Sequence, residues 1–240
     1  MVVCPRSGRV YWTNASGDVL EFAPGAGGGG EGVVSTLLKG EDGMRRDYFG
    51  RYEEDRPGSM AYHWRQVWWH PTFDNGCVVG VHGNSGYLFA MRTPSEPGQR
   101  AKLYLLERLT SLPSRRCGAF DQFSYGYLGF ALPSSLAVQR DKRVFYLTGG
   151  PKFAPNGDRL RGKSSTNKGE SKGDENLHLV TYDLERGQYR DHGPILFSNR
   201  IGGPSYVNSL AVGADGFLYA LARLHNGRTD LFRLPTPLPK

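Results

Sequence analysis

The stretch Asn208–Leu221, which reads NSLAVGADGFLYAL, decides the fold. Two short apolar runs flank the dipeptide Asp215-Gly216, and Asp-Gly is a preferred turn between antiparallel strands. The stretch therefore predicts a β-hairpin. Whether this hairpin is a local feature or one copy of a repeating unit determines the architecture of the whole chain.

Further copies of the hairpin occur along the chain. Ser-Leu-Ala-Val at 209–212 recurs at 135–138, inside SSLAVQRDKRVFYL (134–147), where Asp141 takes the place of Asp215. A third copy, VWWHPTFDNGCVVGVH, covers 67–82 and turns at Asp74-Asn-Gly. A fourth, SGRVYWTNASGDVLEF, covers 7–22, begins at the turn and lacks a strand before it. Four copies indicate a repeat and exclude an isolated hairpin.

Each hairpin is followed by more strand-like sequence. The next strands are expected in GDVLEFAP (17–24), GYLFAMRT (86–93), LHLVTYDLERG (177–187) and TDLFRLP (229–235). The first three units continue with VVSTLL (33–38), KLYLLERL (102–109) and QYRDHGPILF (188–197). The repeating unit is therefore a four-stranded antiparallel meander.

Four-stranded units at a long, loop-variable period are typical of a β-propeller. Ala211–Leu221 and Leu179–Gly187 resemble the "avspdG-xlYv" hairpin and the "lyvyDl-tG" strand of bacterial propellers. The resemblance implies an architecture, not an activity. We expect one all-β domain over 1–240, with blade segments near 1–38, 62–109, 126–197 and 204–240 and a polar insertion at 151–176. Because the first and last blades look incomplete, we expect part of a larger propeller, whose open edges predict self-association.

Composition limits the partners. The chain has 33 glycines, and 12% of its residues are aromatic, which suits an all-β protein. The net charge of +7 favours an anionic partner, but the charges are dispersed and no RNA-binding signature occurs, so nucleic acid is not expected. No apolar run is long enough for a membrane span or a signal peptide, which predicts a soluble chain; an extracytoplasmic location stays open if the chain is incomplete at its N-terminus.

No metal or other cofactor is expected. The three cysteines are too far apart for a CxxC motif, and no close histidine spacing suited to a metal occurs. The segment GDRLRGKS (157–164) matches a phosphate-loop pattern, but it lacks the strand before it and the helix after it that phosphate binding needs.

The loops that join the second strand of a unit to the third, and one unit to the next, lie on one face of the repeat and are long and chemically varied. We therefore place the functional site on this loop-rich face. Aromatic rings beside cationic side chains suit an acidic sugar. The candidate ligand-binding residues are Arg65, Asn84, Arg115, Asp121, Gln122, Tyr127, Lys172, His178, Arg200, Tyr206 and Asn208.

Three hypotheses follow for this face. The preferred one is non-catalytic binding of an extended anionic carbohydrate. The alternative is a polysaccharide lyase, which needs a cation at the uronate carboxylate and a base for the C5 proton; Tyr125, Arg116, His63 and His82 are its candidate catalytic residues. The third hypothesis is a protein-interaction scaffold, which would present a broad surface with exposed apolar patches.

Overall fold

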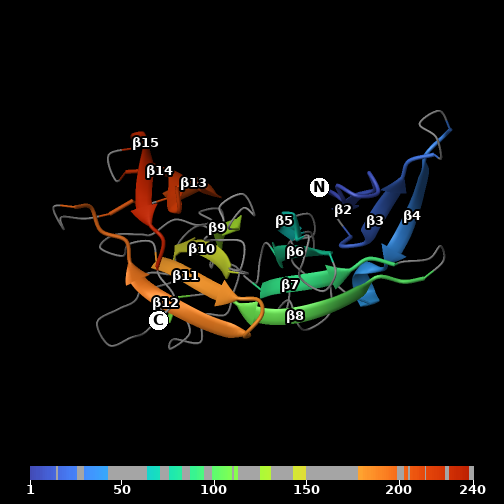
Figure 1. Cartoon of the computed structure of the whole chain (residues 1–240), viewed down its shortest axis with the longest axis horizontal. Coiled ribbons are helices and arrows are strands. Elements are labelled where there is room, and N and C mark those ends of the chain that lie inside the picture. The colour runs from blue at the N-terminus through green and yellow to red at the C-terminus, as the bar shows by residue number, and fades with distance from the viewer. Residues whose placement is uncertain are drawn as a thin grey trace, which may run out of the picture. The chain divides into compact units, whose positions relative to one another are not determined.

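A computed structural model describes residues 1–14, 16–25, 30–42, 64–70, 76–82, 87–94, 99–109, 111–112, 125–130, 143–149, 178–198, 203–204, 206–213, 215–224 and 227–237. These residues form four small antiparallel sheets, each built from strands that follow one another along the chain (Figure 1). The all-β class predicted from the sequence is confirmed. The described part of the chain contains no helix with the length and hydropathy of a membrane span.

The first compact unit, Met1–Glu107, holds two four-stranded sheets. The first sheet consists of β1 (Val2–Val3), β2 (Val10–Thr13), β3 (Val19–Ala23) and β4 (Val33–Leu38), followed by the 3-10 turn η2 (Gly40–Asp42). The second sheet consists of β5 (Trp64–His70), β6 (Cys77–His82), β7 (Tyr87–Arg92) and β8 (Lys102–Arg108). In both sheets the strands lie in the order in which the chain makes them.

The second compact unit, Arg108–Lys240, holds the other two sheets. One consists of β9 (Tyr125–Phe130), β10 (Arg143–Gly149), β11 (His178–Asp183) and β12 (Gln188–Pro194). The other has three strands in the described residues, β13 (Tyr206–Val212), β14 (Phe217–Arg223) and β15 (Thr229–Pro235). The four-stranded meander is thus complete in three sheets, which is compatible with blade-like repeats, while the grouping into a single propeller domain stays a prediction.

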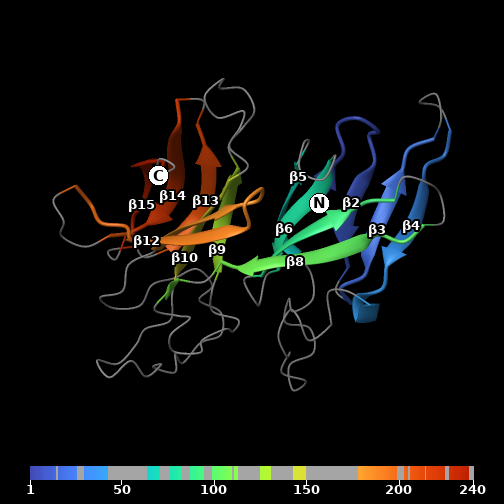
Figure 2. The ribbon, with the colours of Figure 1, turned by 60° about the horizontal axis from the view of Figure 1, so that its bottom comes forward.

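The core of each unit lies between its two sheets. In the first unit, Tyr11 and Val19 pack in one cluster with Phe89 and Met91 of the second sheet. In the second unit, one cluster joins side chains of both sheets, namely Phe145, Leu147, Leu179, Leu210, Val212, Leu218, Ala220 and Ala222. The first strands of the two sheets of a unit also meet, β1 with β5 and β9 with β13 (Figure 2). The side chains of one cluster come from alternate positions along a strand, as Phe145 and Leu147 do, because successive side chains point to opposite faces of a sheet.

Two details differ from the sequence prediction. The first unit does not begin at its turn, because the two-residue strand β1 pairs with β2 through Val2↔Tyr11 and Val3↔Val10. Two residues are too few to show an alternating pattern. The sequence predicts 135–138 as a partner of β10, but these positions lie outside the described residues, and β10 pairs with β9 along one edge and with β11 along the other, so both of its edges are occupied over 144–148.

The hairpin turn within Asn208–Leu221 is closed by two backbone hydrogen bonds. Gly213 N–H donates to the Phe217 carbonyl at 2.7 Å, and Gly216 N–H donates to the Gly213 carbonyl at 3.0 Å. Gly216 has φ of 80°, which is left-handed. The same two bonds, with a left-handed glycine at the same place, occur in 14–18 and 224–228. These three turns are tight hairpins with a glycine bulge.

We expect Gly216→Ala to lower the free energy of unfolding by about 1–2 kcal/mol, because an L-residue is strained in the left-handed region. An added Cβ would meet no heavy atom within 4 Å, so the loss would come from the backbone alone. Urea denaturation measures the effect. Gly216→Asn is the matched control and should lose less, since asparagine tolerates this conformation; equal losses in the two variants would contradict the backbone explanation.

Candidate functional site

The predicted site residues fall into three groups. His63, Asn84, Arg115, Arg116, Asp121, Gln122, Lys172 and Arg200 lie outside the described residues. For Arg65, His82, Tyr125, Tyr127, Tyr206 and Asn208 the structure gives the position on a strand. For His178 it gives the side chain and its contacts.

The strand positions share one feature. Tyr125 begins β9 and Tyr206 begins β13, while His82 ends β6 opposite Trp64, the first residue of β5. His178 begins β11 and lies in one row with Thr148 and Gly126. In the second, third and fourth sheets these residues therefore lie at the end where the first strand of the sheet begins. That is the end at which the sequence predicted the site.

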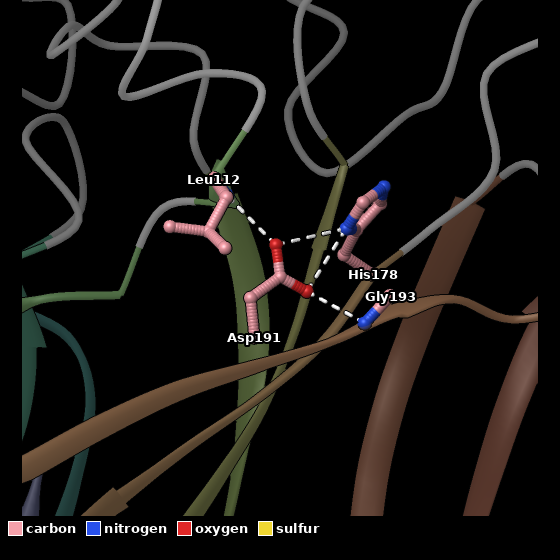
Figure 3. Close-up of polar contacts among 4 residues, drawn as sticks. All are labelled: Leu112, His178, Asp191 and Gly193. Carbon is pink, nitrogen blue, oxygen red and sulfur yellow. Dashed lines mark hydrogen bonds and ion pairs between the residues drawn. The ribbon is translucent and has the colours of Figure 1, made fainter.

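A buried polar cluster lies at this end of the third sheet (Figure 3). His178 Nδ1 lies 3.0 Å from both carboxylate oxygens of Asp191, which comes from the facing strand β12. The Leu112 backbone N–H, from the connection between β8 and β9, donates to Asp191 Oδ2 at 2.7 Å. The Gly193 backbone N–H donates to Asp191 Oδ1 at 2.8 Å. One carboxylate thus joins the neighbouring strands β11 and β12 to Leu112, which is 79 positions away in the sequence.

A β-bulge in β12 lies directly beside Asp191. The pairing of β11 with β12 shifts between His178↔Pro194 and Val180↔Asp191, so β12 holds an extra residue there. Gly193 adopts φ of 88° at this point. Bulges of this kind bend a strand and change the direction of its side chains, and they are frequent next to functional sites.

The charge state of the cluster follows from its hydrogen bonds. Burial pushes the pKa of Asp191 upward, but the bonds from His178, Leu112 and Gly193 outweigh burial and leave this pKa below its ordinary value. Asp191 is thus an ionised carboxylate that only accepts hydrogen bonds. His178 Nδ1 must then carry the proton, and in the neutral ring Nε2 presents a lone pair.

The neighbouring histidine is arranged differently. His192 Nε2 lies 2.8 Å from the Thr181 hydroxyl, so this nitrogen already has a partner within the sheet. Burial lowers the pKa of His192, and the nearby positive charge of Arg190 adds to the effect. His178 of β11 and His192 of β12 are therefore two histidines on neighbouring strands, of which only His178 is bonded to Asp191.

Sequence reasoning missed Asp191 and Leu112. The dipeptide Gly193-Pro194 within β12 is the one local signal, because glycine in a strand indicates a bulge. Leu112 contributes only its backbone N–H, which no side-chain pattern reveals. Among the described residues no group of three or more histidine, cysteine, aspartate or glutamate side chains is placed to hold a metal ion.

A second buried polar cluster lies in the first unit. Arg9 donates from one guanidinium nitrogen to both carboxylate oxygens of Glu21, at 3.0 and 3.1 Å, and the Glu21 side chain is 6% exposed. Tyr11 faces Glu21 across β2 and β3 and stacks on Trp69, with ring centroids 6.1 Å apart. Burial raises the pKa of Tyr11 to about 12, against a hydrogen bond with Thr93 that lowers it. We assign this cluster to the core because its rings pack between the two sheets.

Comparison with protein-family models and with curated proteins finds no match to this chain. The fold and the site therefore define the class of protein: an all-β protein whose described residues form four small antiparallel sheets, with a buried aspartate–histidine pair at one end of the third sheet.

Proposed function

We propose that the protein is a propeller-type ligand-binding domain and that its loop-rich face binds an extended anionic carbohydrate. The observation that supports the proposal is the cluster of Leu112, His178 and Asp191, which joins the connection after β8 to the end of a sheet. A rigid sheet that displays polar groups at the base of long connections is the usual construction of a binding site. The net charge of +7 favours an anionic ligand.

The strands that carry the predicted aromatic residues support the same location. Tyr125 and Tyr127 belong to β9, and Tyr206 and Asn208 belong to β13, and these two strands contact each other. Aromatic rings stack on sugar faces while cationic and polar groups bind carboxylate or sulfate. An acidic polysaccharide offers both features at every repeat.

Binding to a panel of polysaccharides tests the proposal. We expect polygalacturonate, alginate or chondroitin sulfate to bind and neutral dextran not to bind, with an affinity that falls as salt is added. Arg116→Gln should weaken binding about tenfold or more, since a charge-assisted hydrogen bond contributes about 1.5–3 kcal/mol.

Arg186→Gln is the matched control for this experiment. Arg186 lies in the exposed hairpin that joins β11 to β12, at the end of the sheet opposite His178, so its replacement removes the same charge away from the site. We expect no change in affinity from this variant. Equal weakening by Arg116→Gln and Arg186→Gln would mean that net charge, and no specific site, attracts the polysaccharide.

A protein-interaction scaffold is the second candidate function. Leu221 of β14 and Leu231 of β15 are directly opposite each other, and they are 41% and 69% exposed. An exposed apolar pair on neighbouring strands is what a scaffold predicts. Failure of every polysaccharide in the panel to bind would favour this candidate over the first.

A further inference from the structure

We propose that His178 and Asp191 form an acid–base dyad, in which His178 Nε2 takes the C5 proton from a uronic acid residue of the bound polysaccharide. The identity of the substrate rests on the proposed function. The dyad itself rests on the hydrogen bonds that hold Asp191 and on the orientation of the His178 ring. The sequence prediction had made His178 a ligand-binding residue and had placed catalysis elsewhere.

The geometry fixes the ring in one orientation. Both oxygens of Asp191 lie 3.0 Å from His178 Nδ1, and each oxygen also accepts one backbone N–H. Rotation of the ring or of the carboxylate would break at least one of these bonds. Nδ1 is therefore directed at Asp191, and Nε2 is directed away from it (Figure 3).

The burial of the two side chains follows the order that a general base requires. The Asp191 side chain is 2% exposed, and the His178 side chain is 11% exposed. A buried carboxylate that orients an imidazole, whose far nitrogen meets the substrate, is the arrangement used in proton-transferring dyads and triads. The buried negative charge stabilises the imidazolium that forms when Nε2 accepts a proton.

The two histidines differ in which ring nitrogen is engaged. His192 meets the Thr181 hydroxyl through Nε2, the nitrogen that would have to face a substrate. Within the described parts of the chain, His178 Nε2 makes no hydrogen bond, although its Nδ1 is fully engaged. His178 also lies at the end of the sheet where β9 begins. The start of β9 is two strands away from His178, or about 10 Å, a distance that one or two sugar units would span.

The proposed step is a β-elimination that needs no other reactant. Nε2 of neutral His178 takes the C5 proton, the electron pair of the C5–H bond forms the C4=C5 double bond, and the C4–O4 bond breaks. The departing O4 then takes the proton from His178 Nε2–H, which returns the ring to its neutral form. The products are a new non-reducing end with an unsaturated uronate and a shortened chain with a hydroxyl.

The tautomer of His178 tests the dyad without any substrate. Long-range ¹H–¹⁵N spectra of the full chain near neutral pH should show His178 with its proton on Nδ1. Asp191→Asn should change the His178 signals, whereas His192→Gln should leave them unchanged. A wild-type His178 with its proton on Nε2 would overturn the proposal, because that nitrogen could not then act as the base.

The chemical step is tested by measuring binding and product on the same polymers. The wild-type protein should release unsaturated uronate, detected by its ultraviolet absorbance, from a polymer that it binds. His178→Gln and Asp191→Asn should form product at least about 100-fold more slowly and still bind the polymer, while His192→Gln should keep the wild-type rate. Since Asp191 would act as a positioning residue, its variant must also alter the His178 tautomer.

The outcomes separate this proposal from the proposed function. A polymer that binds without giving unsaturated product would overturn the dyad and leave the binding function standing, whereas the absence of binding to every uronate polymer would overturn both. If Asp191→Asn fails to fold, His178→Gln still decides the question, because Asp191 keeps its two backbone donors in that variant.

Discussion

We expect Asp191→Leu to lower the free energy of unfolding by about 3–5 kcal/mol. The substitution keeps the approximate size of the side chain but leaves three donors without an acceptor, on His178, Leu112 and Gly193. Each buried donor that loses its partner costs about 1–3 kcal/mol. Urea denaturation followed by far-ultraviolet circular dichroism measures the loss.

The matched control is Asp215→Leu in the hairpin between β13 and β14. Asp215 also accepts two hydrogen bonds, from the Phe217 N–H and from the Tyr219 hydroxyl, but it is exposed. Water can replace its carboxylate as an acceptor, so we expect a much smaller loss of stability. If the two variants lost the same stability, burial of the Asp191 cluster would not be the reason for its contribution.

The Asp191 cluster also predicts a pH dependence. The pKa of Asp191 lies below its ordinary value of 3.8 in the folded protein. An acid of this kind binds fewer protons in the folded than in the unfolded chain, so it stabilises the fold above pH 3.8 and loses this contribution as the pH falls through its folded pKa. Asp191→Leu should therefore flatten the decline of stability in acid.

The second large effect is expected at Arg9. Arg9→Met should lower the free energy of unfolding by about 3 kcal/mol, because it removes the positive charge paired with the buried Glu21 carboxylate. The double variant Arg9→Met/Glu21→Leu should recover most of this loss, since an apolar pair of similar size needs no charge compensation. A double-mutant cycle in urea measures the coupling.

Arg100→Met provides the surface comparison for this cycle. Arg100 lies 3.6 Å from Asp42, and their side chains are 80% and 39% exposed. An exposed ion pair contributes less than about 1 kcal/mol, so this variant should be close to wild type. A double variant that is no more stable than Arg9→Met alone would contradict the view that an unpaired Glu21 causes the loss.

Local features of the fold could be predicted because they depend on residues close in sequence. The segment 33–38 is β4 and 229–235 is β15, with the bounds expected from their alternation and flanking turns. The left-handed conformation of Gly216 follows from the Asp215-Gly216 dipeptide between β13 and β14. The prediction was wrong where a pattern was misleading or too short: the match of 135–138 to 209–212 does not make that copy the partner of β10, and β1 has only two residues.

The sequence by itself determined most of the strands and their turns, and it indicated the end of the sheets at which a site is expected, because alternating side chains and turn residues act through neighbours along the chain. Only the tertiary structure decided which groups meet there. Leu112 and Asp191 are 79 positions apart, and their hydrogen bond exists because the connection after β8 returns to the bulge of β12. No local pattern encodes such a contact, since it depends on the path of the whole intervening chain. His178 was therefore predictable as a polar residue of this face, while its pairing with a buried carboxylate was not.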